Sequence, residues 1–516
     1  MDRIVILDFG GQTTQLIGRR IRDIGVYTDI YPADTALTEE HLRDTRGIIL
    51  SGSPYSVNDP DPPWPDESVF QSGLPILGIC FGTQILMKYY GGLVSSLPTR
   101  EYGRAGVVFK RSSPLFEGVP EHFSSWMSHG DSIDRLAAGF EIAAESENGI
   151  TAAVEATDLP FFGLQFHPEV SHCEYGNRIL ENFAVSICGA EKSWTMDRYI
   201  EDTVENIRRR VGDGKVLLLI SGGVDSTVVA GLLLRALPPD RVCLLHIDTG
   251  LMRKNESQEV IRDLEKFGAS HLHFVDASGE FLSALQGVDD PEKKREIIGD
   301  LFITVQEREV QRLEVRGAYL AQGTLYTDLI ESGKGVGKKA HVIKSHHNVR
   351  SPLVEEKRAA GMIIEPLDRI YKDEVRRVGR KIGISEDVVA RHPFPGPGLA
   401  VRILGEVTPE KCEVLREADA IYVAELKRRG LYDQIWQAFS VLLPVRSVGV
   451  TGDARNYGYV LALRAVVSAD GMTADVYPFP FKDLQEISSL ITNSLREIGR
   501  VVYDCSSKPP STIEWE

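Results

Sequence analysis

The sequence has few cysteines and no long apolar run. Its six cysteines are scattered without C-x-x-C spacing, which indicates neither a disulfide framework nor a zinc site. No run reaches the ~18 apolar residues that a membrane span needs, and the apolar run behind Met1 is too short for a signal peptide. We therefore expect a cytoplasmic protein with no membrane partner.

An excess of basic residues is also missing. The net charge is −16 and the sequence pI is near 5.3, which argues against a general nucleic-acid surface, so we expect no nucleic-acid partner. Apolar residues make up 42% and charged residues 26%, as in ordinary globular proteins. A chain of 516 residues is too long for one core and suggests roughly three domains.

A glycine-rich turn is the most specific pattern in the chain. It follows an apolar run at 216–220, precedes helix formers at 228–237, and consists of Ser221, Gly222, Gly223, Val224, Asp225, Ser226 and Thr227. Adjacent glycines permit positive φ and a close approach to a ligand, while the hydroxyls and the helix start favour an anion. No lysine follows the glycines, so the mononucleotide loop is excluded. The turn predicts a polyanion site; the alternative is an ordinary strand-to-helix turn.

A second candidate site combines a cysteine with a His-x-Glu pair. Cys80 lies between Gly78 and Gly82, after an apolar run at 75–79, in a pattern typical of a nucleophile elbow. A helix starting behind it favours the thiolate. After another apolar run, His167 could face the thiol and Glu169 could face the imidazole. The alternatives are a buried apolar cysteine and a surface turn.

Short apolar runs alternate with helical patterns in two regions, at 3–79 and at 212–385. This order predicts parallel sheets whose ligands lie at the carboxyl ends of the strands. There Asp248, which ends the strand at 242–247, would meet a nucleotide's ribose or its metal. Residues 391–398 form a proline–glycine linker, and strands beside helices follow it. The predicted fold class is therefore α/β, with two open parallel-sheet domains (1–192 and 193–391) and a smaller α+β domain (392–516).

The first 190 residues resemble the class I glutamine amidotransferases. The resemblance implies that Cys80 is the nucleophile, His167 the general base and acid, and Glu169 its orienter, and that glutamine is hydrolysed through a thioester to release ammonia. It places the oxyanion hole at the backbone of Ser53 and Phe81; the family usually has glycine where Ser53 stands, which affects the resting geometry of the hole. Residues that it implies for holding glutamine are Gln84, Ser128, His129 and Asp131.

The glycine-rich turn resembles the pyrophosphate loop of the N-type ATP pyrophosphatases, which cleave ATP between the α- and β-phosphates. The resemblance implies that Mg²⁺ accompanies ATP, with Asp225 as a candidate metal ligand. The residues that would bind ATP or pyrophosphate are those of the turn (221–227) together with Asp248, Gly323 and Lys344. Residues 323–348 are rich in glycine and lysine, which suggests a lid; the alternative is a surface loop.

Three further strings narrow the resemblance to the GMP synthases: G-T-L-Y-x-D-x-I-E-S from Gly323, I-K-S-H-H-N around Lys344, and the ending S-K-P-P-x-T-I-E-W-E. This implies adenylation of xanthosine 5′-monophosphate (XMP), displacement of AMP by ammonia, and a homodimer formed through the C-terminal domain. The implied XMP-binding residues are Arg295, His346, Asn348, Lys508 and Glu514. The alternatives are an asparagine- or NAD-synthesising ligase, and a regulatory protein with an inactive amidotransferase domain.

Overall fold

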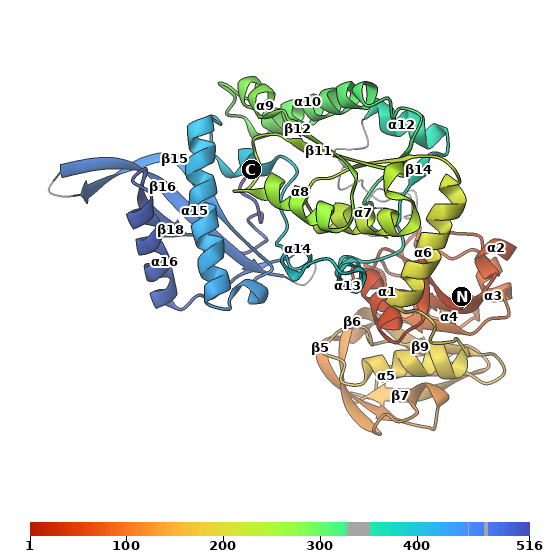
Figure 1. Cartoon of the computed structure of the whole chain (residues 1–516). Coiled ribbons are helices and arrows are strands. Elements are labelled where there is room, and N and C mark those ends of the chain that lie inside the picture. The colour runs from red at the N-terminus through yellow and green to blue at the C-terminus, as the bar shows by residue number, and fades with distance from the viewer. Residues whose placement is uncertain (327, 329–350, 452–453, 469–472) are drawn as a thin grey trace. The chain divides into compact units, whose positions relative to one another are not determined.

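The computed structural model describes residues 1–326, 328, 351–451, 454–468 and 473–516 (Figure 1). The chain separates into two compact units: the first contains Met1–Tyr199, and the second contains Ile200–Tyr326 and the described residues from 351 onward. None of the described helices is long and apolar enough to cross a membrane. The domain boundaries predicted at 192 and 391 stay predictions.

The first unit is built on a nine-stranded sheet of order β2-β1-β3-β4-β9-β8-β7-β5-β6. Its first five strands pair in parallel, as predicted. Two of them, β4 and β9, are apolar and buried throughout, as expected of parallel strands that are covered on both faces. The five strands are β1 (Arg3–Asp8), β2 (Tyr27–Pro32), β3 (Thr45–Leu50), β4 (Ile76–Ile79) and β9 (Phe161–Leu164).

The other strands of this sheet are antiparallel, so the predicted parallel sheet is one half of a mixed sheet. Short connections allow antiparallel pairing, whereas a parallel pair needs a crossover. Residues 126–131 lie in a strand here, although their polar sequence taken alone suggests a loop. The antiparallel strands are β5 (Leu93–Phe109), β6 (His122–Arg135), β7 (Phe140–Ser146) and β8 (Thr151–Ala156).

Helices of the first unit follow its parallel strands. The most important for the site is α4, which begins directly after Cys80 and contacts β4, β9 and β3. The helices are α1 (Thr14–Asp23), α2 (Glu39–Leu42), α3 (Ser68–Gln71), α4 (Phe81–Tyr89) and α5 (Gly176–Glu181), with a 3-10 turn at Pro114–Phe116 and a π-helical turn at Asn182–Ile187.

The second unit contains a five-stranded sheet of order β12-β11-β10-β13-β14, in which every pair is parallel, as predicted. Both neighbours of β10 follow it in the chain: β11 and β12 lie on one side of it, and the chain then crosses to its other side to form β13 and β14. This reversal makes the carboxyl end of β10 a topological switch point. The strands are β10 (Val216–Leu219), β11 (Val242–Asp248), β12 (His271–Asp276), β13 (Tyr319–Ala321) and β14 (Ile363–Ile364).

The helices around this sheet include α7, which starts at Val224 and not at the predicted 228. The carbonyl of Gly223 already accepts the N–H of Thr227, so the helix begins inside the glycine-rich turn. The helices are α6 (Met196–Val211), α7 (Val224–Ala236), α8 (Glu256–Lys266), α9 (Ser278–Ala284), α10 (Pro291–Arg312), α12 (Pro352–Ala359), α13 (Lys372–Ile382) and α14 (Glu386–Val389), with a 3-10 turn at Pro239–Arg241.

The last part of the second unit is a smaller α+β arrangement, as predicted. Figure 1 shows two helices, α15 and α16, beside its sheet. A parallel strand, β18, pairs with β16 and is absent from the sequence prediction. The elements are α15 (Pro409–Arg428), β15 (Gln437–Thr451), β16 (Ala454–Val467), β17 (Asp475–Val476), α16 (Phe481–Ser494) and β18 (Ile498–Tyr503), with 3-10 turns at Gly398–Arg402 and Tyr432–Gln434.

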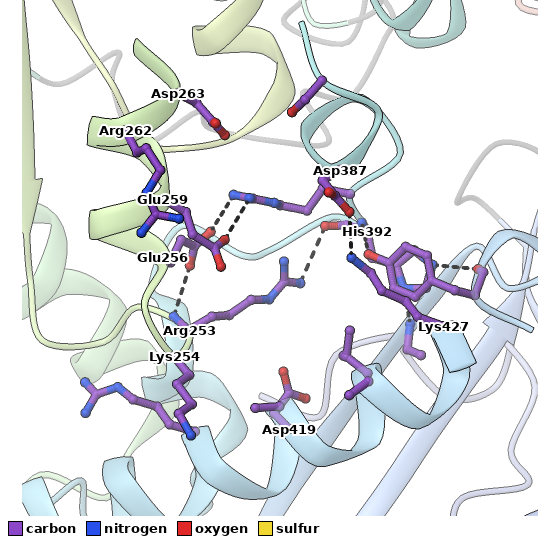
Figure 2. A pocket seen from close by; sticks show the side chains of 18 of the residues that line it. Arg253, Lys254, Glu256, Glu259, Arg262, Asp263, Asp387, His392, Asp419 and Lys427 are labelled. Carbon is purple, nitrogen blue, oxygen red and sulfur yellow. Dashed lines mark hydrogen bonds and ion pairs between the residues drawn. The ribbon is translucent and has the colours of Figure 1, made fainter. Parts of the chain in front are cut away.

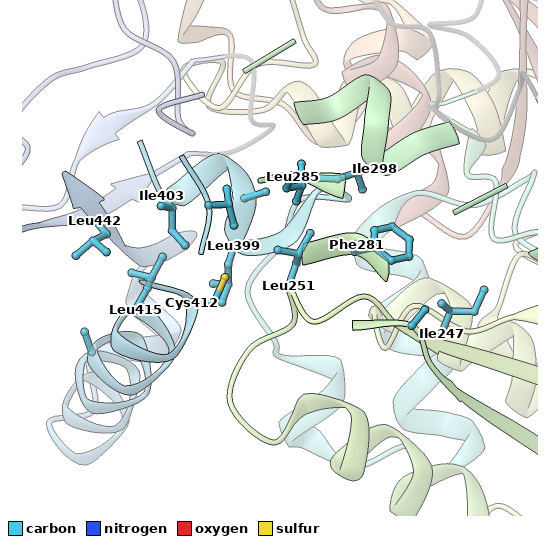
Figure 3. Close-up of a cluster of buried hydrophobic side chains, with 14 of the residues drawn as sticks. Ile247, Leu251, Phe281, Leu285, Ile298, Leu399, Ile403, Cys412, Leu415 and Leu442 are labelled. Atoms are coloured by element: carbon cyan, nitrogen blue, oxygen red, sulfur yellow. The ribbon is translucent and has the colours of Figure 1, made fainter. Parts of the chain in front are cut away.

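One apolar cluster joins this smaller sheet to the parallel sheet of the second unit (Figure 3). Leu251 and Phe281 come from the parallel-sheet part, and Leu399 and Leu415 come from the chain after the linker; all four side chains are fully buried. The N–H of Leu399 also donates to the carbonyl of Leu251 at 2.8 Å. The two parts therefore share a core.

We expect Leu415→Ala to destabilise the second unit by ~2–5 kcal/mol, because a fully buried leucine is replaced by a cavity. Urea unfolding followed by fluorescence measures the change. Leu490→Ala is the control, since Leu490 is 41% exposed and should cost far less. Equal effects of the two substitutions would contradict the assignment of this core.

Candidate active sites

Cys80 lies on a sharp turn between β4 and α4. Its φ of 52° and ψ of −105° are rare for a residue that is not glycine. The turn is possible because its flanks carry no side chain: a Cβ at Gly82 would lie 2.2 Å from the carbonyl oxygen of Leu50, and one at Gly78 would lie 2.5 Å from the nitrogen of Thr83. The predicted elbow is thus the observed geometry.

His167 and Glu169 form a buried pair in the same unit. The imidazole Nδ1 lies 2.7 Å from Glu169 Oε1, which leaves Nε2 as the nitrogen for the Cys80 thiol. Burial alone would lower the pKa of His167, but the Glu169 carboxylate and the contact with Cys80 raise it well above its usual value. A Cβ at Gly52 would lie 3.2 Å from the imidazole, so this glycine leaves room for the ring.

The residues predicted to hold glutamine lie on β6 and on α4, the helix that begins after Cys80. The thiol approaches the carbonyl of Ser128 at 3.9 Å. The backbone carbonyl of Asp131 accepts Gln84 Nε2 and His129 Nδ1, each at 3.0 Å. The structure therefore gathers the Cys80 elbow and strand β6 at one place.

The residues predicted for the oxyanion hole lie in the loop after β3 and at the start of α4. Ser53 follows β3, and its hydroxyl donates to the carbonyl of Phe9 at 2.8 Å. Phe81 is the first residue of α4, where backbone N–H groups have no acceptor within the helix. A thiol, an imidazole and a carboxylate in this order suit covalent acyl transfer.

The glycine-rich turn of the second unit ends β10 at the topological switch point. Gly222 has a φ of +82°, and a Cβ there would lie 2.6 Å from the Val260 side chain. The hydroxyls of Ser226 and Thr227 donate to the Gly223 carbonyl at 3.1 and 3.0 Å, and the Ser221 hydroxyl lies 3.2 Å from that of Ser226. A close-packed turn at the start of the 13-residue helix α7 suits an anion.

Asp225 lies in the first turn of α7. One of its carboxylate oxygens accepts a hydrogen bond and the other does not. Its Oδ2 accepts Lys372 Nζ at 2.5 Å, whereas Oδ1 is buried without a hydrogen-bond partner. Gly323 packs against it: a Cβ there would lie 3.3 Å from the Asp225 Cβ. Asp248, at the end of β11, accepts the Gly250 N–H at 2.8 Å and the Ser257 hydroxyl at 2.9 Å.

The predicted nucleotide contacts of the C-terminal tail are engaged within the chain. Glu514 forms a bidentate pair with Arg402, at 3.0 and 2.8 Å, and accepts Gln437 Nε2 at 2.7 Å. Arg295 donates to the backbone of Glu516 at 2.5 Å. Lys508 forms two backbone hydrogen bonds with Ala474, which attach the tail to the smaller sheet. Three further candidates lie outside the described residues: Lys344, His346 and Asn348.

A charged pocket of about 490 Å³ opens between α8, α15 and the segment around His392 (Figure 2). None of its lining residues is a predicted site residue. Its connection to the glycine-rich turn is Arg391, which donates to the carbonyl of Gly222 at 3.3 Å and to Glu259 at 3.2 Å. We therefore interpret this wall of the pocket as a support for the turn.

The sequence prediction missed several residues that contact the candidate sites. Lys372 is 147 positions from Asp225, Arg402 is 112 positions from Glu514, and Arg391 is 169 positions from Gly222. No local spacing signals such pairs. The one available clue to Arg391 is its place at the start of the proline–glycine linker.

Three known protein families match separate parts of the chain, which together make up most of its length. Residues 5–187 match the family described as glutamine amidotransferase class-I. Residues 211–277, which include the glycine-rich turn, match the family of the thiamine biosynthesis protein ThiI. Residues 424–515 match the GMP synthase C terminal domain. The fold and these family matches thus define a ligase with a glutamine amidotransferase domain and an ATP-binding domain of the PP-loop type.

Full-length relatives identify the particular ligase. The "GMP synthase [glutamine-hydrolyzing]" of Caldicellulosiruptor saccharolyticus is 48% identical over 514 residues, which cover 99% of each chain. The enzyme of the same name from Aquifex aeolicus is 48% identical over 516 residues, with 99% of each chain covered. A solved glutamine amidotransferase from Thermotoga maritima matches 41% of this chain and 86% of its own, at 20% identity and a TM-score of 0.29. The chain belongs to the glutamine-hydrolysing GMP synthases.

We expect Glu169→Gln to lower the pKa of His167, because the substitution removes a negative charge while burial, which also lowers the pKa, remains. A histidine NMR titration measures the shift. Glu147→Gln is the control, since Glu147 pairs with the exposed His122. An unchanged titration of His167 would mean that Glu169 does not hold its proton.

Proposed function

We propose that this chain aminates XMP to GMP, using ATP–Mg²⁺ and ammonia released from glutamine by Cys80, His167 and Glu169. The observation that carries the proposal is the buried His167–Glu169 pair, 2.7 Å apart, beside the Cys80 elbow. The names of the full-length relatives supply the substrate class. A regulatory protein with an inactive amidotransferase domain is disfavoured because all three residues are present.

In the glutaminase half, His167 Nε2 takes the thiol proton and Cys80 Sγ attacks the side-chain amide carbon of glutamine. The N–H groups of Ser53 and Phe81 would stabilise the oxyanion. His167 then protonates the departing ammonia, leaving a thioester that water hydrolyses to glutamate. Glu169 keeps the proton of Nδ1 in place, so the same imidazole nitrogen serves as base and acid.

In the synthetase half, the C2 oxygen of XMP attacks the α-phosphorus of ATP and pyrophosphate leaves. The adenylated intermediate carries a good leaving group, and ammonia displaces AMP to give GMP. The turn from Ser221 to Thr227 would hold pyrophosphate with its hydroxyls and with the start of α7. Asp248 and Gly323 border the nucleotide site in this proposal.

The residues present fit a magnesium ion that arrives with ATP. Mg²⁺ usually binds one or two protein carboxylates and completes its shell with phosphate oxygens and water. Asp225 offers one such oxygen, the buried and unpartnered Oδ1. When bound, the ion neutralises phosphate charge; Asp225 would hold it, and Lys372 would orient the carboxylate.

The same proposal covers the residues that bind XMP, which accepts the amino group, and the oligomeric state of the protein. Arg295, His346, Asn348, Lys508 and Glu514 would bind XMP, and Lys344 would bind ATP. Because Glu514 is paired with Arg402 here, it would share or exchange that partner when the purine binds. The C-terminal domain would form the homodimer contact. Incubation with glutamine, ATP–Mg²⁺ and XMP, with GMP, AMP and pyrophosphate quantified, tests the overall reaction.

We expect Cys80→Ala to abolish glutamine-dependent GMP formation and to leave formation from ammonium salts nearly intact. Cys80 makes ammonia in this proposal, and the second unit only consumes it. Both rates are measured by the absorbance change on conversion of XMP to GMP. Equal losses with the two nitrogen sources would make Cys80 a structural residue.

We expect Asp225→Ala to lose GMP formation from both nitrogen sources, because ammonia does not bypass adenylation. Basal glutamine hydrolysis should persist, since Asp225 belongs to the other unit. Release of AMP and pyrophosphate in the presence of XMP is the measurement. Normal release would remove the glycine-rich turn from the pyrophosphate site.

A further inference from the structure

One peptide of the glycine-rich turn is held by a residue from outside the turn. Arg391 Nη1 donates to the carbonyl oxygen of Gly222 at 3.3 Å. This carbonyl belongs to the peptide that joins Gly222 to Gly223. The C=O and N–H groups of a trans peptide point in opposite directions, so the contact directs the Gly223 N–H into the turn. That N–H donates to the Ser221 hydroxyl oxygen at 3.3 Å, on the side of the turn that carries the hydroxyls.

Glycine at both ends leaves this peptide with little steric restraint. Turning the peptide over changes ψ of Gly222 and φ of Gly223, and residues without a Cβ accept either orientation. The next carbonyl along the chain, that of Gly223, is fixed by α7, because it accepts the N–H of Thr227 and the hydroxyls of Ser226 and Thr227. The Gly222 carbonyl lies before the helix and takes its hydrogen bond from Arg391 instead.

The orientation of this peptide decides what the turn presents to an anion. Gly223 is the N-cap of α7 and has no side chain that could cap the helix, so the first N–H groups of the helix stay available to a ligand. In the observed orientation, the Gly223 N–H adds a donor on the same side as the hydroxyls. In the opposite orientation, a carbonyl oxygen would face the anion there and repel it.

Two carboxylates of α8 hold the guanidinium of Arg391. Its Nη2 donates to Glu259 at 3.2 Å, and its Nη1 lies 3.7 Å from Glu256 Oε1. Figure 2 shows both carboxylates on the α8 side of the charged pocket. The side chain of Glu256 is 4% exposed and that of Arg391 is 15% exposed. A planar guanidinium between two acceptors is a well-oriented donor, more so than an ammonium group.

The residue after Arg391 fixes the backbone at this point. The ring of His392 stacks on that of Tyr432, with ring centroids 3.8 Å apart. Its Nδ1 accepts the N–H of Ala438 at 3.1 Å, and its Nε2 donates to the carbonyl of Tyr432 at 3.0 Å. Burial lowers the pKa of His392 to about 4, so the ring keeps the neutral form that this pattern requires. The chain after the linker therefore helps to set the position of Arg391.

We propose that Arg391 is a positioning residue for the glycine-rich turn: it holds the Gly222 carbonyl outward and so keeps the Gly223 N–H directed at the pyrophosphate of ATP. This inference rests on the proposed function, in which the turn holds pyrophosphate. Arg391 does not contact that ligand itself, because its guanidinium lies on the opposite side of the peptide from the Gly223 N–H.

Three substitutions in the full chain test this role. Arg391→Met keeps most of the side-chain length and removes every donor, so the Gly222–Gly223 peptide can turn over. Arg391→Lys restores a charged donor for the Gly222 carbonyl. Arg262→Met is the matched control, because Arg262 lines the same pocket from α8 at an exposed position and its loss removes the same charge.

We expect Arg391→Met to weaken the binding of pyrophosphate by about tenfold, the effect of one lost hydrogen bond to a charged group. The KM for ATP in ammonia-dependent GMP formation should rise by a similar factor, while kcat at saturating ATP stays within about threefold of the wild type. Arg391→Lys should bind pyrophosphate within about threefold of the wild type, and Arg262→Met should match it. Calorimetry with inorganic pyrophosphate and Mg²⁺ gives the affinities, and the melting temperature of each variant is recorded.

Three results would overturn the inference. Wild-type affinity for pyrophosphate in Arg391→Met would show that the turn keeps its shape without Arg391. An equal loss in Arg262→Met would assign the effect to the charge of the pocket and not to the contact with Gly222. No recovery in Arg391→Lys, together with a lowered melting temperature in both variants, would make Arg391 a residue of the fold alone. Failure of the wild-type chain to form GMP and release pyrophosphate would instead refute the proposed function.

Discussion

Both candidate sites depend on one constraint: a buried parallel strand must release the chain through a tight turn into a helix. At the carboxyl edge of the sheet, glycines let the backbone turn closely enough to bring polar groups and the start of the helix together. In the first unit the turn places Cys80 at a left-handed φ, and in the second it places Gly222 there. The two chemistries differ because one turn presents a thiol and the other presents hydroxyls and N–H groups.

Buried cations tie the C-terminal tail into the second unit. Lys294, Arg402 and Arg464 are fully buried, and each bonds to the tail: Lys294 to Glu516, Arg402 to Glu514, and Arg464 to the carbonyls of Ser506 and Thr512. Leaving such charges without partners would be strongly unfavourable. The tail is therefore part of the fold of this unit, and its sequence carries a structural constraint in addition to any role in binding XMP.

Short sequence patterns predicted those parts of the sites whose residues lie close together in the sequence. The glycine-flanked Cys80, the His167–Glu169 pair two residues apart, and the glycine-rich turn each carry their geometry in a short string. The antiparallel half of the first sheet was missed because β5 contains proline, glycine and charged residues without a period of two. Lys372, Arg402 and Arg391 meet their partners through tertiary packing, which no local spacing encodes.

The two histidines near Cys80 show how one pocket separates proton chemistry from positioning. Glu169 contacts His167 at 2.7 Å, and with the thiol it raises the pKa of this ring against burial. Glu101 stands 3.8 Å from His129, so burial prevails and lowers the pKa of that ring. Environments that push two pKa values apart assign different tasks to the groups. In the proposed mechanism, His167 therefore carries the proton of the reaction, while His129 takes no part in the proton transfer.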